Sequence, residues 1–118
     1  YAYYGNRQDK NNFVDSIHLL LKQYLLFRAA KLYAEEDPRK PLTVFEMGCG
    51  KGTDLFHWNY IHEHIRAIQF YLGTDYDVHG LHRKGGAIER YLQGTHRENT
   101  AYTLETKYPF DALFAQVI

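Results

Sequence analysis

The residues best suited to chemistry form a glycine-rich segment at positions 44–55, which reads VFEMGCGKGTDL. A β-prone run precedes its glycines, and a run with helical spacing follows them. Glycine permits positive φ and lets a ligand approach the backbone, while the first turn of a helix presents unpaired amide groups. The sequence therefore predicts a ligand site at this turn.

Spacing distinguishes three kinds of glycine turn. A phosphate-binding P-loop would need glycine at position 45 and serine or threonine at position 52, but the chain has Phe45 and Gly52. A dinucleotide-binding turn would need glycines at positions 48, 50 and 53, and the last of these is Thr53. The form that remains is an acidic residue followed by x-G-x-G-x-G, which here begins at Glu46.

A second acidic residue, Asp75, ends the next apolar run, in the sequence Leu72-Gly73-Thr74-Asp75. A carboxylate at the end of a second parallel strand is placed to accept hydrogen bonds from the hydroxyl groups of a ribose. The glycine turn and this acid together predict a ligand that contains a nucleoside. The alternative is a glycine-rich turn without a ligand, in which Asp75 is a solvated surface carboxylate.

The elements that position these residues follow from hydrophobic periodicity and from breaks at glycine and proline. Helices and strands are predicted in alternation at residues 12–36, 42–47, 51–64, 67–72, 78–92 and 110–118. The first helix is expected to be amphipathic, and the short apolar strands are expected to be buried on both faces. Two adjacent glycines, Gly85 and Gly86, predict a kink or break in the last helix. The alternation predicts an α/β fold with a parallel sheet.

Length and composition limit the chain to one globular domain, because it has 118 residues, of which 45% are hydrophobic and 24% charged. Three parallel strands that end on a buried one would leave a bare sheet edge, so we expect only the N-terminal part of a larger domain. No apolar run approaches the ~20 residues needed to cross a bilayer, so no membrane partner is expected.

Charge, cysteine and histidine content narrow the chemistry further. Lys plus Arg and Asp plus Glu are each 14, so any contact with nucleic acid must be local. The single cysteine, Cys49, excludes an internal disulfide and is typical of the cytosol or nucleus. The spacing of His57, His62 and His64 gives no i, i+4 pair on a helix, so we expect solvated histidines and no metal site.

Several motifs together resemble a known enzyme family. Residues 45–55 and Trp58 are similar to the L-D-L-G-C-G-K-G-G-D-L-x-x-W run of enzymes that methylate N7 of the guanine in mRNA caps. Other segments that resemble this family are Tyr3-Tyr4-Gly5-Asn6, Leu21-Lys22-Gln23, Glu89-Arg90-Tyr91 and the strand from Phe110 to Gln116. The resemblance covers nearly the whole chain. It implies the N-terminal part of a Rossmann-like class I methyltransferase, with its cofactor-binding βαβ unit at residues 42–92.

The resemblance implies S-adenosyl-L-methionine as the cofactor and capped RNA as the acceptor, with other capping-enzyme domains or subunits as possible partners, in the nucleus or cytoplasm. The residues implied in cofactor contact are Lys22, Gly48, Cys49, Gly50, Asp54, Asp75, Tyr76 and Gln116. Those implied on the cap side are Lys51, Arg90 and Asn6. Because guanine N7 carries a free lone pair and no proton has to leave, no acid–base or covalent catalytic residue is expected.

The chain also departs from the family pattern. His18 and Leu19 stand where the family has an asparagine pair, and His57 stands in place of a second cap-side lysine. Two other functions therefore stay open: a class I methyltransferase for another nucleic acid, a protein or a small molecule, and a catalytically silent module that binds a partner.

Individual site residues have simpler structural interpretations as well. Lys22 could be a helix lysine whose stem covers apolar surface, and Arg90 could be a surface cation. Gln116 could be a satisfied core amide, and Tyr76 could fill the core instead of packing on adenine.

Overall fold

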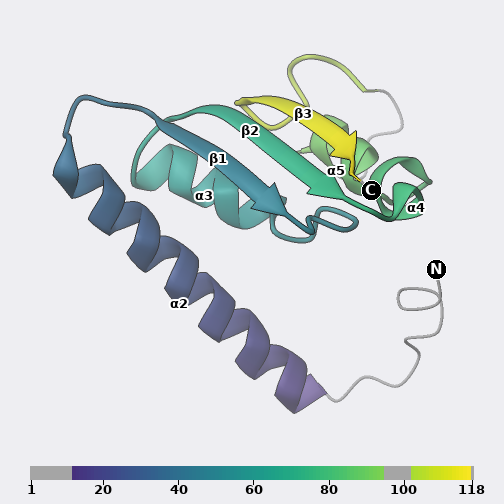
Figure 1. The fold of residues 1–118 in the computed structure, drawn as a ribbon, viewed down its shortest axis with the longest axis horizontal. Coiled ribbons are helices and arrows are strands. Elements are labelled where there is room, and N and C mark those ends of the chain that lie inside the picture. Colours follow the sequence, from purple (N-terminus) through teal and green to yellow (C-terminus); the bar gives the residue numbers. More distant parts are fainter. Residues whose placement is uncertain (1–11, 95–101, 118) are drawn as a thin grey trace.

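The computed structural model describes residues 12–94 and 102–117 and shows an α/β fold (Figure 1). Its helices are α2 (Asn12–Glu36), α3 (Leu55–His64), α4 (Val78–His82) and α5 (Ala87–Gln93). Its strands are β1 (Leu42–Met47), β2 (Ile68–Asp75) and β3 (Asp111–Gln116), which form a parallel sheet in the order β1-β2-β3. The predicted α/β class and parallel sheet are confirmed.

Strand register brings the carboxyl ends of all three strands to one edge of the sheet. In the central strand, Thr74 pairs with Met47 of β1 and with Ala115 of β3. The strand β2 runs to Asp75, three residues beyond its predicted end, because residues 73–75 take part in these pairings. The edge that carries the strand ends also carries the glycine turn, as expected of a parallel α/β sheet.

Two element boundaries depend on glycine. The helix α3 begins at Leu55, whereas the sequence predicted position 51, because residues 51–54 form turns. The helices α4 and α5 are separated at Gly85 and Gly86, where the sequence predicted a break. Gly85 has a φ of +79°, and a Cβ on Gly86 would lie 2.6 Å from the carbonyl oxygen of Gly80.

Helices cover only one face of the sheet among the described residues. In Figure 1, α3 and α5 both lie behind it, and the main core joins Val44 and Tyr71 of the sheet to Ile61 of α3. On the opposite face, Phe45 is 60% exposed and Met47 is 77% exposed. The prediction that the strands are buried on both faces is therefore wrong for this part of the chain, because the helices pack on the same side.

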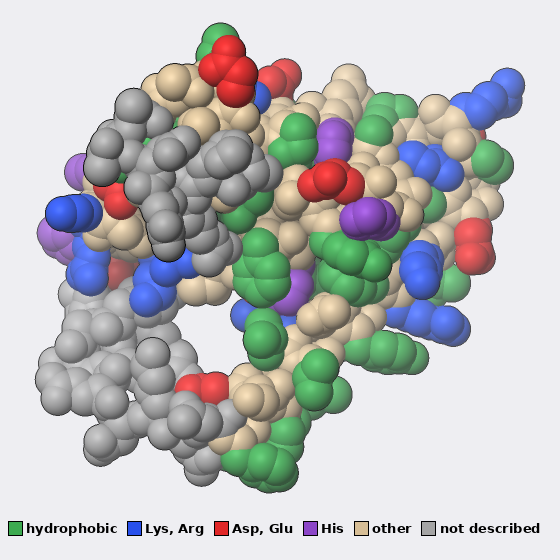
Figure 2. All heavy atoms as spheres, turned by 180° about the vertical axis from the view of Figure 1, so that it is seen from behind, with side chains coloured by type: hydrophobic (Ala, Val, Ile, Leu, Met, Phe, Trp, Pro, Cys, Tyr) green, Lys and Arg blue, Asp and Glu red, His purple; other side chains and the backbone are tan. Residues whose placement is uncertain are grey.

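The long helix α2 packs only through its C-terminal half. Ala30 and Ala34 are buried, and Phe27 packs against the core. Nearer the N-terminal end, Phe13 is 74% exposed and Leu20 is 64% exposed, and Figure 2 shows hydrophobic side chains gathered over this helix. The predicted apolar stripe is thus mostly solvent-facing. None of the described helices is both long and apolar enough to cross a membrane.

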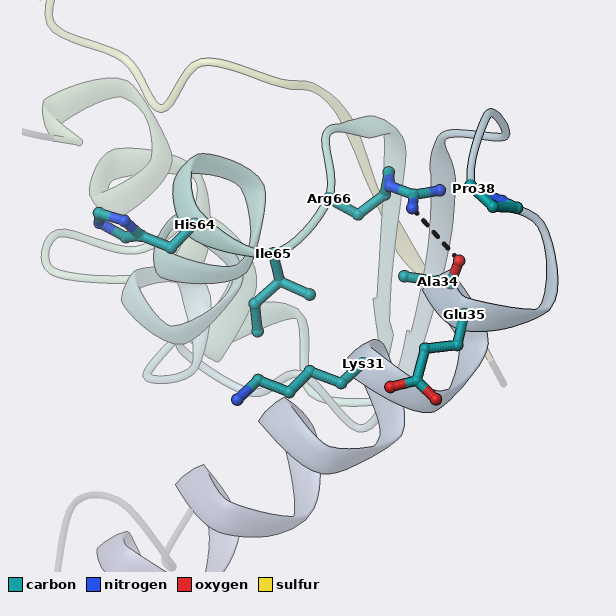
Figure 3. A pocket seen from close by; sticks show the side chains of 7 residues that line it. All are labelled: Lys31, Ala34, Glu35, Pro38, His64, Ile65 and Arg66. Atoms are coloured by element: carbon teal, nitrogen blue, oxygen red, sulfur yellow. Dashed lines mark hydrogen bonds between the residues drawn. The ribbon is translucent and has the colours of Figure 1, made fainter.

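Arg66, between α3 and β2, fixes the end of α2 to the body of the protein (Figure 3). Its Nη1 donates to the carbonyl oxygens of Asp37, at 2.8 Å, and Lys40, at 2.9 Å, and its Nη2 donates to that of Ala34, at 3.2 Å. Three carbonyl groups at the end of α2 and in the following loop are thereby satisfied by one guanidinium. This contact sets the path of the chain into β1.

We predict that Arg66→Lys lowers the free energy of unfolding by about 1–3 kcal/mol, because an ammonium lacks the planar fork that reaches three carbonyls. Urea denaturation measures the loss. As a control, Arg39→Lys, at an exposed position in the same loop, should change stability by less than about 0.5 kcal/mol. Equal stability of the two variants would contradict the role given to Arg66.

Candidate functional site

The glycine turn that follows β1 folds back over the end of β2. The amides of Gly48 and Cys49 both donate to the carbonyl oxygen of Thr74, at 2.7 and 2.9 Å. The φ angles are +74° at Gly48, +58° at Gly50 and +78° at Gly52. Other residues rarely adopt such angles, so the turn needs glycine at all three positions.

The carboxylate of Asp75 organises this turn. Its Oδ2 accepts a 2.7 Å hydrogen bond from the Gly50 amide, and its Oδ1 accepts a 2.9 Å hydrogen bond from the Asp77 amide. The side chain is only 7% exposed, so the alternative of a solvated surface carboxylate is wrong. A carboxylate has about four lone-pair positions, so Asp75 can still accept about two more hydrogen bonds.

Two further site residues predicted from the sequence, Tyr76 and Gln116, lie on the other side of Asp75. The amide Nε2 of Gln116 donates to the carbonyl oxygen of Tyr76 at 3.1 Å, and the Val117 amide donates to that of Asp75 at 3.0 Å. Tyr76 is 76% exposed, and Gln116 is exposed too, so neither is the core residue that the simpler interpretations required. The ends of β2 and β3 therefore carry an exposed aromatic ring and an exposed amide at the rim of the turn.

Lys22 and Asp54 form an ion pair across the turn. The Lys22 Nζ lies 3.3 Å from Asp54 Oδ1, with the lysine 49% and the aspartate 16% exposed. Asp54 immediately precedes α3, and its carbonyl oxygen accepts from the amides of His57 and Trp58. The helix α2 thus brings a cation to the acid at the start of α3, and both groups were predicted from the sequence as cofactor contacts.

Beneath the turn, Glu46 lies in a network that the expected site residues did not include. Its Oε1 accepts from the hydroxyl of Tyr71 at 2.5 Å and from Trp58 Nε1 at 3.3 Å. Burial, and then the nearby Asp54 carboxyl, raise the pKa of Glu46 to about 7. The x-G-x-G-x-G pattern pointed to Glu46, but no sequence signal pointed to Tyr71.

Gly73 makes room for the Tyr71 side chain. A Cβ at Gly73 would lie 2.9 Å from Tyr71 Cε1 and 3.1 Å from the Cys49 sulfur, so only glycine lets the ring reach Glu46. Burial also raises the pKa of Tyr71, with Glu46 as the next cause. Burial, then Glu46 and Asp75, raise the pKa of the Cys49 thiol to about 12, so the thiol is protonated and its role at the turn is packing.

The sequence predicted that the three histidines of α3 are solvated, but only His64 is exposed, while His57 is buried and His62 is partly buried. His57 is 1% exposed, and its ring lies 4.0 Å from that of Phe56 and 6.0 Å from that of Phe27. Its Nε2 has no hydrogen-bond partner among the described residues, and burial lowers its pKa. His62 Nδ1 accepts from the Ile68 amide at 2.9 Å. Within residues 12–94 and 102–117, no three His, Cys, Asp or Glu side chains form a possible metal site.

The cap-side residues predicted from the sequence lie on adjoining segments. Gly52 packs against the start of α5, since a Cβ there would lie 3.0 Å from Ala87 Cα. Lys51 is the neighbour of Gly52, and Arg90 lies three residues after Ala87, so the two cations flank this close contact. Both side chains are partly buried. The Arg90 Nε donates to the carbonyl oxygen of Gly85 at 3.2 Å, which leaves its other nitrogens for further contacts. Asn6 lies outside the described residues.

No protein-family model and no curated protein matches this chain. The geometry of the turn is therefore the main support for a function. Two hollows of about 460 and 390 Å³ lie along α2, and neither is lined by residues of the turn. We place the candidate site at the turn rather than at these hollows, because the turn gathers buried carboxylates, open backbone and the Lys22 ammonium at the carboxyl ends of parallel strands.

We predict that Glu46 makes stability fall as the pH rises. Its pKa of about 7 lies above the ordinary 4.5, so the folded state holds a proton that the unfolded chain loses above pH 4.5. Between pH 4.5 and 7 this group lowers the free energy of unfolding by roughly 2–3 kcal/mol. We expect the free energy of unfolding, measured with urea, to fall less between pH 5 and pH 8 for Glu46→Gln than for the unmodified protein.

The control for this prediction is Glu63→Gln, at an exposed carboxylate that accepts from Asn59 Nδ2 at 2.8 Å. For Glu63→Gln, the free energy of unfolding should fall between pH 5 and pH 8 by as much as it does for the unmodified protein. If Glu46→Gln behaved in the same way as Glu63→Gln, Glu46 would not hold a proton in the folded protein.

Proposed function

We propose that this chain is part of a Rossmann-like class I methyltransferase that uses S-adenosyl-L-methionine to methylate N7 of the guanine in mRNA caps. The observation that carries the proposal is the hydrogen bond from the Gly50 amide to Asp75 Oδ2, 2.7 Å long. It joins the glycine turn to the acid at the end of β2, and these two features carry the resemblance to the family. The parallel sheet with the candidate site at the carboxyl ends of its strands fits an α/β fold of this kind.

The residues present fit the nucleoside half of the cofactor. The acceptor capacity left on Asp75 suits the two hydroxyls of a ribose, and the exposed ring of Tyr76 offers a face for adenine. A Cβ built on Gly48 would meet nothing within 4 Å, so the backbone there is open to a ligand. Gln116 at the end of β3 adds an exposed amide to the same rim.

The ion pair of Lys22 and Asp54 fits the methionine half. That part of the cofactor carries a carboxylate and an ammonium, and the chain presents an ammonium and a carboxylate 3.3 Å apart. Exchanging one ion pair for two charge-assisted contacts to the ligand keeps every charge paired. Lys22, which is half-exposed, can turn to the ligand carboxylate without leaving a buried charge behind.

The bound cofactor would supply a methyl group on a positively charged sulfur. Guanine N7 attacks with its own lone pair, so no proton has to be removed. The task of the chain is to hold N7 in line with the methyl group of the cofactor. Lys51 and Arg90, and Asn6 outside the described residues, would hold the cap phosphates. Capped RNA, other capping-enzyme domains or subunits, and a nuclear or cytoplasmic location all belong to this proposal.

A class I methyltransferase for a different acceptor is the second candidate. The groups specific to a cap are few, and the guanidinium of Arg90 already donates to Gly85 at 3.2 Å. The net charge of 0 also provides no general attraction for RNA. In this case the cofactor would bind as above and the acceptor would differ.

We predict that Asp75→Asn raises the dissociation constant for S-adenosyl-L-methionine at least about tenfold, because an amide nitrogen replaces an acceptor for the ribose and the turn. Isothermal titration calorimetry measures the change. The matched control is Asp77→Asn, since Asp77 caps α4 by accepting from His79 at 3.0 Å and asparagine caps equally well. An unchanged dissociation constant for Asp75→Asn would refute the ribose assignment.

We also predict that replacing Lys51 and Arg90 together by glutamine raises the Michaelis constant for capped RNA by about tenfold or more and leaves that for the cofactor unchanged. Each cation would contact the phosphates of the acceptor and not the cofactor. The salt dependence of binding to capped RNA should also become weaker, because fewer phosphate charges are neutralised.

The control pair is Arg83→Gln with Lys84→Gln, two exposed cations between α4 and α5. It removes the same charge and should leave both Michaelis constants as they are. Equal methylation of capped and uncapped RNA by the unmodified protein would exclude the cap and leave the second candidate.

A further inference from the structure

Two carboxyl groups lie together beneath the glycine turn, and neither the ribose contact nor the phosphate contacts explain why. Glu46 at the end of β1 and Asp54 before α3 are close enough to hydrogen-bond through their side chains. A hydrogen bond between two carboxyl groups needs one proton, since two carboxylates have only acceptors. The nearest cation, Lys22, is paired with Asp54 at 3.3 Å. The cluster therefore has one cation for two acids.

The surroundings of Glu46 allow it to hold that proton. Tyr71 from β2 and Trp58 from α3 donate to its Oε1 and leave the other oxygen for Asp54. The other titratable groups near the pair are Cys49 on the turn, His57 on α3 and Lys22 on α2. Burial keeps the Cys49 thiol protonated and His57 neutral at pH 7, so neither balances the second acid.

His57 gives an independent sign that the cluster is incomplete. The side chain is 1% exposed, and its Nε2 has no hydrogen-bond partner among the described residues. The charges of Asp54 and Lys22 both act on it. A buried polar atom without a partner calls for an explanation, and a ligand group that binds beside Asp54 would supply one.

We propose that Glu46 is a positioning residue that couples binding to proton release: when a cationic group of the ligand enters beside Asp54, the proton shared by Glu46 and Asp54 leaves to solvent. This rests on the proposed function, in which the cationic group is the ammonium of S-adenosyl-L-methionine. The proton leaves the carboxyl of Glu46 for the buffer, and no other bond changes. The site then holds three negative charges, on Glu46, Asp54 and the ligand carboxylate, and three positive charges, on Lys22, the ligand ammonium and the ligand sulfur, so its charges are balanced.

The direction of the pH effect follows from the free protein. Glu46 has a pKa of about 7 without ligand, and a bound cation lowers that value. Below pH 7, binding must therefore first remove a proton, and affinity falls as the pH decreases. Between pH 7.5 and pH 6 the dissociation constant should rise roughly tenfold, and at pH 7 binding should release about half a proton.

The test is calorimetry of S-adenosyl-L-methionine binding to the intact protein at pH 6, 7 and 7.5. Repeating each titration in buffers of different ionisation enthalpy gives the number of protons released. At pH 7 the unmodified protein should release about half a proton more than Glu46→Gln, in which only the ligand's own amino group exchanges protons. The ligand's own amino group affects both proteins equally, so its titration cancels in the ratio of their two dissociation constants. The change of this ratio with pH therefore measures the contribution of Glu46.

A second variant serves if Glu46→Gln does not fold. Tyr71→Phe keeps the ring and removes the hydroxyl, whose hydrogen bond lowers the pKa of Glu46. The pH at which affinity falls should therefore move upward. The control is Asp77→Asn, a buried carboxylate on the same rim that does not face Glu46, and its pH dependence should match that of the unmodified protein.

The outcomes separate this inference from the proposed function. Tight binding with equal affinity at pH 6 and 7.5 and no proton release would overturn the role of Glu46 and leave the cofactor assignment standing. The same would follow if Glu46→Gln kept the full pH dependence. Absence of binding at every pH would overturn both.

Discussion

The candidate site depends on one hydrogen bond, from the Gly50 amide to the carboxylate of Asp75. It connects residues 25 positions apart, and it can form only because β1 and β2 are parallel and end at the same edge of the sheet. Gly50 has a φ of +58°, which residues other than glycine rarely adopt. The Asp75 carboxylate, which would accept from the ligand, and the glycine turn, which would surround it, therefore form a single unit. Neither keeps its geometry without the other.

Features with a local cause could be predicted from the sequence. The glycine turn, the helix over residues 12–36 and the break at Gly85 and Gly86 each follow from backbone preferences within a few residues. The parallel arrangement followed from the alternation of helices and strands. Asp75 could be linked to the turn because parallel strands bring their carboxyl ends together.

Features that depend on distant packing could not be predicted in this way. Periodicity shows that α2 has an apolar side but not what covers it, and the exposure of Phe13 and Phe45 follows from where α3 and α5 happen to lie. His57 is buried because Phe27 of α2 crosses over it. Tyr71 reaches Glu46 because residue 73 has no side chain, a relation between two strands that no single segment of the sequence expresses.

The attachment of α2 gives the site a mechanical property. The helix is held at its C-terminal end by Arg66 and Ala34, and nearer its middle by the ion pair of the half-exposed Lys22 with Asp54. The packing of α2 against the core begins at Leu26. At 1.5 Å per residue, Lys22 lies about 6 Å along the helix from this point, so a tilt of about 20° there would carry it roughly 2 Å. A tilt of the arm of α2 that precedes Leu26 would therefore separate Lys22 from Asp54. A partner that binds the apolar side of this N-terminal arm would move Lys22, and the ion pair at the glycine turn would change with it.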